Sequence, residues 1–221
     1  MTGTLYVMNP NSSVSVTAGI DDAMAPLRKF GVPISCTTLA EGPPGIENQK
    51  QADLVVPPLL AQALTLESKA SGYVIACFGD PGLHAMRDQT DLPVLGIQEA
   101  AVMTALTMGQ RFGVIAILPG SIPRHLRAFG AMGVLGRCAG DRALGLGVAE
   151  LANPDATVTR MIEVGTRLRD EDGADVLIMG CAGMAQYRNV LQDRLQMPII
   201  EPCQAAAAMA LGRIALNWEG F

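Results

Sequence analysis

The sequence has few aromatic residues, two histidines and no long apolar run. Aromatic residues make up 4% of the 221 positions, and arginine supplies most of the basic residues. No apolar stretch reaches membrane-spanning length, and no Lys/Arg cluster accompanies the net charge of −5. We therefore expect neither membrane insertion nor nucleic acid as a partner. The C-x-x-C and H-x-x-x-H spacings of zinc sites are also missing, so no metal is expected.

Two further absences concern the redox state and the location of the protein. The five cysteines form no pattern typical of a disulfide framework, and their odd number favours reduced thiols. Residues 1–8 pass almost directly into a predicted strand, without the basic and apolar regions of a signal peptide. These features predict a cytoplasmic protein.

What the sequence does contain is an alternation of short apolar strands and helices. Apolar residues make up 49% of the chain, which also has 24 glycines, as suits close packing of helices on a parallel sheet. Residues 72–83 read as a buried strand that ends on Cys77, a glycine-containing turn and the start of a helix. We expect Asp80 to be the N-cap of that helix and Pro81 its first residue.

The same arrangement recurs in the second half of the chain. Residues 175–184 again run through a strand, a cysteine (Cys181), a glycine turn and a helix start. In each half, the proline of the next strand follows the cysteine by 16 or 17 residues, and an alanine-rich helix comes after it. The repeat predicts an α/β protein of two pseudo-symmetric flavodoxin-like lobes, each with a parallel four-stranded sheet flanked by helices. The lobes are expected at residues 1–98 with 207–221, and at residues 99–206.

Both matched cysteines are predicted at the carboxyl ends of strands, where ligands bind in open α/β sheets. If the lobes face each other, the thiols flank one cleft from opposite sides. Such a pair suits racemisation, which removes a proton from one face of a carbon and returns one to the other face. We expect the following helix N-termini to lower the thiol pKa values, so that one thiolate acts as the base. Backbone N–H groups that can stabilise an enolate are those of Phe78, Gly79, Ala182 and Gly183.

Three segments together resemble the hydantoin and allantoin racemase branch of the Asp/Glu racemase superfamily. They are residues 77–83 (CFGDPGL), 180–184 (GCAGM) and 9–13 (NPNSS). The resemblance covers essentially the whole chain. It implies racemisation without a cofactor at C5 of a 5-substituted hydantoin, with Cys77 and Cys181 as acid and base. The C5–H of such a ring is acidic because the carbanion delocalises into the ring amide carbonyl.

The resemblance also implies which loops contact this small-molecule substrate. The strand-end loops are expected to line the cleft with Asn11, Ser12, Ser121, Ile122 and Pro123. Asn11 and Ser12 have the alternative role of only capping the next helix. Residues 118–121 depart from the polar, threonine-rich turn that the family leads us to expect, which suggests a differently shaped substituent. Glu201 either contacts the substrate or caps the last helix.

The remaining cysteines and the histidines are expected to be structural. Cys36, Cys138 and Cys203 are interpreted as small apolar core residues. His84 is expected at the surface or in a structural role. For His125, which follows the loop at residues 118–123, a role in the cleft is less favoured than a structural one.

Three alternatives to a hydantoin racemase stay open at this stage. One is an allantoin racemase of purine catabolism, and another is a decarboxylase similar to arylmalonate decarboxylase. The decarboxylase needs only one cysteine, so the second matched thiol argues against it. The third is a two-lobed small-molecule binding protein, a class that usually carries an export signal. The apolar helices predicted at residues 98–108 and 204–216 pack against each other or against a second subunit, and the resemblance implies a homo-oligomer.

Overall fold

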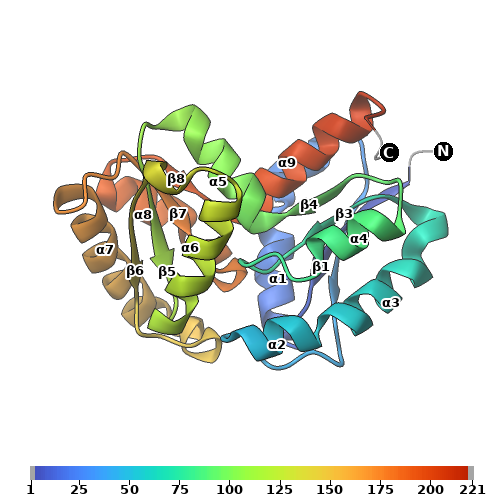
Figure 1. Cartoon of the computed structure of the whole chain (residues 1–221), viewed down its shortest axis with the longest axis horizontal. Coiled ribbons are helices and arrows are strands. Elements are labelled where there is room, and N and C mark those ends of the chain that lie inside the picture. The colour runs from blue at the N-terminus through green and yellow to red at the C-terminus, as the bar shows by residue number, and fades with distance from the viewer. Residues whose placement is uncertain (1–2, 219–221) are drawn as a thin grey trace.

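The computed structural model describes residues 3–218 and contains two parallel four-stranded sheets, as predicted (Figure 1). The first has the order β2-β1-β3-β4 and the second the order β6-β5-β7-β8, so the two halves share one topology. All six strand pairs are parallel. The strands are β1 (Thr4–Asn9), β2 (Ile34–Thr38), β3 (Ala70–Ile75), β4 (Val94–Gly96), β5 (Phe112–Ala116), β6 (Cys138–Ala143), β7 (Val176–Met179) and β8 (Ile199–Ile200).

Helices connect the strands and cover the sheets. The α-helices are α1 (Val14–Ala23), α2 (Gln49–Leu54), α3 (Val56–Leu66), α4 (Leu83–Gln89), α5 (Ile97–Met108), α6 (Ile122–Ala131), α7 (Pro154–Asp170), α8 (Arg188–Leu195) and α9 (Pro202–Ala215). Within the described residues, the 3-10 helices are η1 (Ala25–Phe30), η2 (Glu67–Lys69), η3 (Pro119–Ser121), η4 (Leu135–Arg137), η5 (Val148–Ala152) and η6 (Ala182–Tyr187). Among residues 3–218, no helix combines the length and the apolar character needed to cross a membrane.

Proline explains one boundary that differs from the sequence-based expectation. A single helix was expected from Val14 to Lys29, but α1 ends at Ala23 and the chain continues as η1. Pro26 lies in the first turn of η1. It has no N–H to donate, and its ring would clash with the carbonyl one helical turn before it. The α-helical pattern therefore stops just ahead of this residue.

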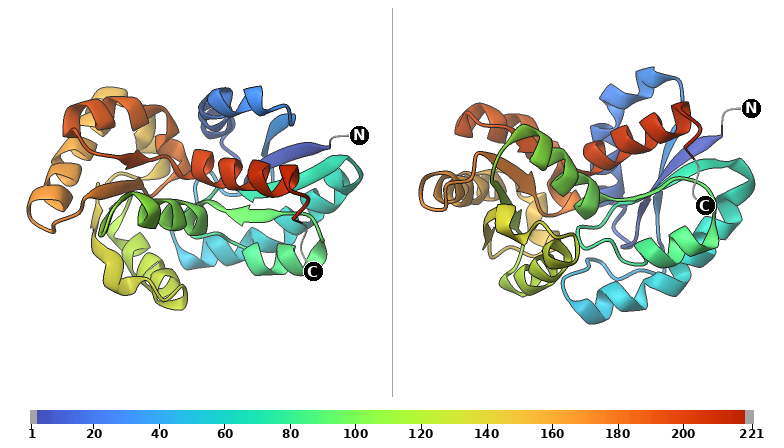
Figure 2. Two further views of the ribbon diagram at one scale, coloured as in Figure 1. Left: turned by 90° about the horizontal axis from the view of Figure 1, so that it is seen from above. Right: turned by 45° about the horizontal axis from the view of Figure 1, so that its top comes forward.

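Two alanine-rich helices join the halves. Helix α5 follows the first sheet in the chain but packs on strands of the second, whereas α9 follows the second sheet and packs on strands of the first. The two helices lie side by side between the sheets (Figure 2). Small side chains such as those of Ala101 and Ala206 are fully buried there, in a hydrophobic cluster that also contains residues of both sheets. Packing of the helices against each other was one of the two expected outcomes.

The expectation for Asp80 was wrong. The N-cap of α4 is Gly82, and Asp80 has a positive φ of 47°. The Asp80 carboxylate accepts hydrogen bonds from the N–H groups of Gln98 (2.9 Å) and Glu99 (2.8 Å), so it caps α5 instead. A Cβ atom at Gly96 would lie only 2.2 Å from the Asp80 carboxyl carbon, so only glycine leaves room for this cap. Asp80 thus caps a helix that is distant in sequence, α5, and not the helix that directly follows it, α4.

Glu201 performs the equivalent task in the second half. Its carboxylate accepts hydrogen bonds from the N–H groups of Cys203 (3.0 Å) and Gln204 (2.6 Å) at the start of α9. Of the two roles considered for Glu201, helix capping is the one observed. Each half therefore places a carboxylate at the N-terminus of its alanine-rich helix, buried for Glu201 and partly buried for Asp80. That carboxylate comes from the strand end in the second half and from a distant loop in the first.

Candidate active site

Cys77 and Cys181 line one cavity between the two sheets. Each follows the carboxyl end of the third strand in its half, β3 or β7, next to the first strand, β1 or β5. The first strand is the point where the strand order reverses, the position at which open α/β sheets bind ligands. The cavity has a volume of about 20 Å³, which is room for about one water molecule. It is lined by Asn11, Ile46, Ala76, Cys77, Phe78, Ile117, Ser121, Arg124, Val148, Gly180, Cys181, Ala182 and Gly183.

Most of the expected site residues lie around the thiols, but not all do. Besides the two cysteines, the lining includes five of them, namely Asn11, Phe78, Ser121, Ala182 and Gly183. Ser12 lines a neighbouring cavity instead. Gly79, Ile122 and Pro123 line neither cavity, because Gly79 and Pro123 are exposed and Ile122 begins α6.

A hydrogen-bond network at the end of β1 shapes the loop that carries Asn11. The fully buried Asn9 donates through Nδ2 to Asn11 Oδ1 (2.9 Å) and to Thr17 Oγ1 (3.0 Å). The Asn11 Oδ1 atom also accepts from the N–H of Ser13 (2.9 Å). Ser13, not Ser12, is the N-cap of α1. Asn9 belongs to the segment 9–13 that the family resemblance rests on, but it ends β1 and supports the loop rather than lining the cavity.

The thiol pKa values differ from the expectation. Burial and, as a smaller effect, the charge of a Cys181 thiolate together raise the pKa of Cys77 to about 12. Burial also raises the pKa of Cys181 to about 11, although the N–H of Gly183, 3.4 Å from its sulfur, lowers it. The prediction that helix N-termini would lower both values is therefore wrong, because α4 begins only at Leu83 and desolvation dominates at both thiols.

Arg124 is a cavity residue that sequence reasoning missed. Its Nη2 atom donates to Ser121 Oγ (3.3 Å), and its charge acts to lower the pKa of Cys77. Ser121 is itself buried and lies directly before α6, which carries Arg124 in its first turn. An arginine shortly after a strand-end loop was the signal that could have drawn attention to it.

The structure places His125 behind the cavity. His125 Nδ1 lies 2.8 Å from Asp141 Oδ2, and both side chains are buried. The His125 ring meets the ring of Phe78 edge to face, with 4.9 Å between centroids. Because Phe78 lines the cavity and His125 does not, the histidine supports the wall rather than facing the thiols.

Two loops close over the thiols. The Glu47 carboxylate accepts a hydrogen bond from the N–H of Val148 (2.9 Å), which links a loop of the first half to η5 of the second. A Cβ atom at Gly45 would lie 2.7 Å from the Cβ of Val148, so the valine occupies space that any other residue at position 45 would need. Val148 and Ile46, next to Gly45, both line the small cavity, so the two loops enclose it.

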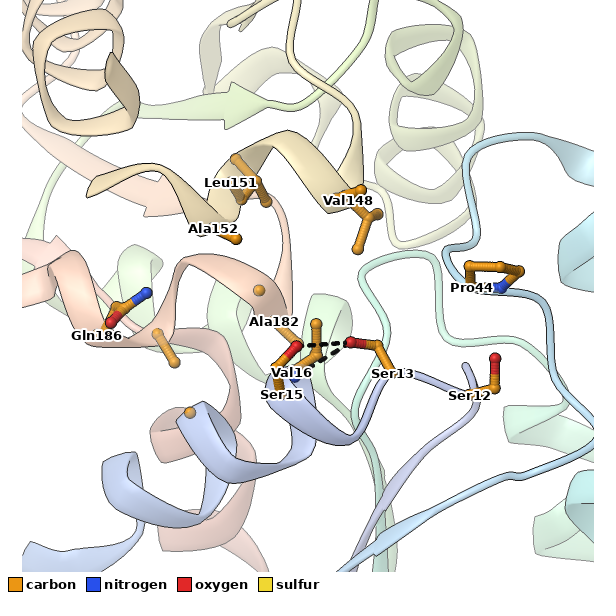
Figure 3. Close-up of a pocket in the computed structure, with 14 residues that line it drawn as sticks. Ser12, Ser13, Ser15, Val16, Pro44, Val148, Leu151, Ala152, Ala182 and Gln186 are labelled. Atoms are coloured by element: carbon orange, nitrogen blue, oxygen red, sulfur yellow. Dashed lines mark hydrogen bonds between the residues drawn. The ribbon is translucent and has the colours of Figure 1, made fainter. Parts of the chain in front are cut away.

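A second cavity adjoins the first and shares Val148, Ala182 and Gly183 with it. Its volume is about 400 Å³. Figure 3 shows Val148 and Leu151 on one wall and Ser13, Ser15 and Val16 on the other. None of the lining side chains is charged.

The other cysteines and His84 take the structural roles expected of them. Cys203 is buried, and Cys36 and Cys138 pack against the same hydrophobic cluster. His84 is exposed on α4. Within the part of the chain that the structure describes, no three His, Cys, Asp or Glu side chains are grouped so that they could hold a metal ion.

Comparison with known proteins places this geometry in a family. Residues 5–210 match the model of the family described as Asp/Glu/Hydantoin racemase. The chain is 33% identical to the hydantoin racemase of Paenarthrobacter aurescens, over 97% of this chain and 92% of that protein. It is 34% identical to the hydantoin racemase of Rhizobium meliloti, over 93% and 86% of the two chains. The structure of allantoin racemase from Klebsiella pneumoniae superposes with a TM-score of 0.91 at 29% identity, over 99% of this chain and 90% of that one. The chain is therefore an isomerase of the racemase type that belongs to the Asp/Glu/Hydantoin racemase family.

Proposed function

We propose that the protein inverts the C5 stereocentre of 5-substituted hydantoins by a two-base mechanism without a cofactor. The observation that carries the proposal is the pair of thiols, Cys77 and Cys181, which line one cavity from the two halves of the fold. One thiolate takes the C5 proton, and the electron pair moves into the ring carbonyl to form an enolate. The other thiol then donates its proton to the opposite face of C5, so the two thiols exchange roles in each turnover.

The raised thiol pKa values suit this reaction. A carbon acid such as the C5–H is weakly acidic, and a thiolate of high pKa is a stronger base toward it. The cost is that only a small fraction of the enzyme holds a thiolate at neutral pH, since the pKa of Cys181 is about 11. Proton transfer inside a small, enclosed cavity compensates in part, because bulk water does not compete for the thiolate.

The neighbouring cavity is the proposed site of the 5-substituent. It opens from the thiol cavity past Val148 and has about 400 Å³ of space with uncharged walls. Apolar side chains such as Val16 and Leu151 suit an alkyl or aryl group, and the serines suit a polar one. We favour hydantoins over allantoin because the apolar walls match bulky side chains better than a ureido group, and because the curated relatives named above are hydantoin racemases.

The first test measures loss of optical rotation with enantiopure L-5-benzylhydantoin and with one enantiomer of allantoin. Wild-type protein is compared with Cys77→Ser, Cys181→Ser and the matched core variant Cys138→Ser. We expect wild type and Cys138→Ser to racemise the hydantoin, and both active-site variants to lose more than about 99% of the rate.

A second readout separates two bases from one. In D₂O, each active-site variant retains one thiol, so it should exchange the C5 proton of one enantiomer only, and the two variants should select opposite enantiomers. Exchange of both enantiomers by one variant would contradict the two-base mechanism. Racemisation of allantoin alone would identify allantoin as the substrate and give the protein a role in purine catabolism. Release of CO₂ from phenylmalonate without racemisation of either ring would favour a decarboxylase, and binding without turnover would favour a binding protein.

We also propose that the protein forms homo-oligomers. Met103 and Met108 on α5 are about half exposed. An exposed apolar side chain of this kind is suited to contact a second subunit. Sedimentation that gives a mass above the 23.2 kDa of one chain would support this, and a monomer would contradict it.

A further inference from the structure

Arg124 carries a charge that no acidic side chain of residues 3–218 pairs with in a salt bridge. Its Nε atom is buried and has no hydrogen-bond partner within the described part of the chain. A buried donor without a partner destabilises a protein, because it has lost its hydrogen bonds to water. The side chain therefore presents an unused N–H group and an unpaired positive charge.

Neighbouring residues hold the Arg124 side chain at the wall of the thiol cavity. The guanidinium lines that cavity and donates to the buried Ser121 hydroxyl. The next residue, His125, is anchored to Asp141 and fixes the first turn of α6. The charge is close enough to Cys77 to lower the pKa of its thiol.

We propose that Arg124 is a catalytic residue that donates to the ring carbonyl oxygen next to C5 and stabilises the enolate formed there. This inference rests on the proposed function. When the thiolate takes the C5 proton, negative charge moves from sulfur to that oxygen. A fixed donor with a full positive charge in an enclosed cavity stabilises such an oxyanion more than it stabilises the neutral carbonyl.

A role for Arg124 in binding a charged 5-substituent is less consistent with the structure. The cavity with space for the substituent has no charged wall, and Arg124 does not line it. The guanidinium lines the small cavity that holds both thiols, where the reacting carbon must lie. The charge is thus placed at the reaction centre.

The test compares Arg124→Gln and Arg124→Lys with wild type, and Arg127→Gln is the matched control. Arg127 is one turn further along α6, exposed, and bonded to Gln49. The substrates are 5-benzylhydantoin and 5-phenylhydantoin, both uncharged. In the phenyl compound the carbanion also delocalises into the aryl ring, so less charge reaches the oxygen. We expect Arg124→Gln to lower kcat about 100-fold for the benzyl compound and about 10-fold for the phenyl compound, with KM changed less than threefold.

The other variants bracket this result. Arg124→Lys keeps the positive charge but loses the planar set of guanidinium N–H donors, so its kcat should lie between those of Arg124→Gln and wild type. The kcat of Arg127→Gln should stay within about twofold of wild type. An equal loss for both substrates would overturn the inference, because misfolding or a displaced helix lowers both rates alike. Unchanged activity of Arg124→Gln would overturn it as well. If wild type racemises neither hydantoin, the proposed function and this inference both fail, which is distinct from failure of Arg124 alone.

Discussion

Opposite charges lie near the two thiols. Arg124 acts to lower the pKa of Cys77, whereas Glu47 acts to raise that of Cys181. Neither effect reverses desolvation, which dominates at both sulfurs. Each charge therefore changes the pKa of one thiol by less than burial does.

Glu47→Gln should shift the pH profile of racemisation to lower pH. Glutamine can still accept the hydrogen bond from the N–H of Val148 but removes the negative charge that raises the pKa of Cys181. A lower pKa means more thiolate at neutral pH, so kcat/KM at pH 7 should rise about two- to threefold. The measurement is kcat/KM from pH 6 to 10.

A neighbouring carboxylate provides the control for that experiment. Glu150→Gln alters η5 close to Val148, but Glu150 is not among the groups that shift the pKa of Cys181. Its profile should overlay that of wild type. An equal shift in both variants would attribute the effect to the loop rather than to the charge of Glu47.

The buried cap Glu201 makes stability depend on pH. Burial raises its pKa from 4.5 to about 7, although the N–H groups of Cys203 and Gln204 oppose this. The folded state then binds this proton more tightly than the unfolded state. Protonated Glu201 therefore contributes to the free energy of unfolding in full below pH 4.5, and this contribution is lost as the pH rises toward 7. Glu201→Gln stays neutral. Relative to wild type, its free energy of unfolding should increase over this range by at most about 1.4 kcal/mol per pH unit.

Urea unfolding at several pH values checks this prediction. The decisive quantity is the difference between variant and wild type at each pH, because Asp80 contributes similarly to both proteins and cancels. A difference that stays constant from pH 4.5 to 7 would show that Glu201 does not hold its proton in the folded state.

At the scale of elements, η5 and the loop around Gly45 control how the two cavities connect. The buried side chain of Val148 lines both cavities, and its backbone N–H is held by Glu47. The element is short, and besides its packing in the second half it is linked to the first half by the Glu47–Val148 hydrogen bond and the close approach of Gly45 to Val148. Specificity for the 5-substituent is expected to depend on this side chain.

Val148→Ala should widen the passage between the cavities. We expect the ratio of kcat/KM for 5-benzylhydantoin to that for 5-methylhydantoin to rise severalfold, at a cost of about 2 kcal/mol in stability. Val190→Ala, on the solvent side of α8, is the control and should leave the ratio unchanged. If the ratio also stays constant in Val148→Ala, the side chain of Val148 does not determine which 5-substituent is accepted.

At the scale of the whole molecule, α5 and α9 hold the halves together. Each helix follows one sheet and packs on the other, and their alanines allow a close approach. The hydrophobic cluster between the sheets is continuous through both helices. Whether the lobes behave as domains with boundaries near residues 98 and 207 stays a prediction.

Ala206→Leu should destabilise both halves together. The alanine is fully buried between the sheets, so a larger side chain overpacks the junction and costs about 1–3 kcal/mol. Ala208→Leu on the exposed side of the same helix is the matched control. Thermal unfolding should show one transition in every protein, and its midpoint temperature should be lowered only in Ala206→Leu. Two separate transitions would mean that the halves unfold independently.

The repeat, both parallel sheets and the equivalent positions of Cys77 and Cys181 could be predicted from the amino-acid sequence, because apolar strands and strand-end turns leave a local pattern that recurs. The surroundings of the two thiols could not be predicted in this way. Asp80 caps a helix 18 residues away, Arg124 reaches the cavity from α6, and Glu47 bonds to Val148 across 101 residues. Burial likewise raised the thiol pKa values that local helix starts were expected to lower. These features depend on long-range packing and desolvation, which have no signature in neighbouring residues.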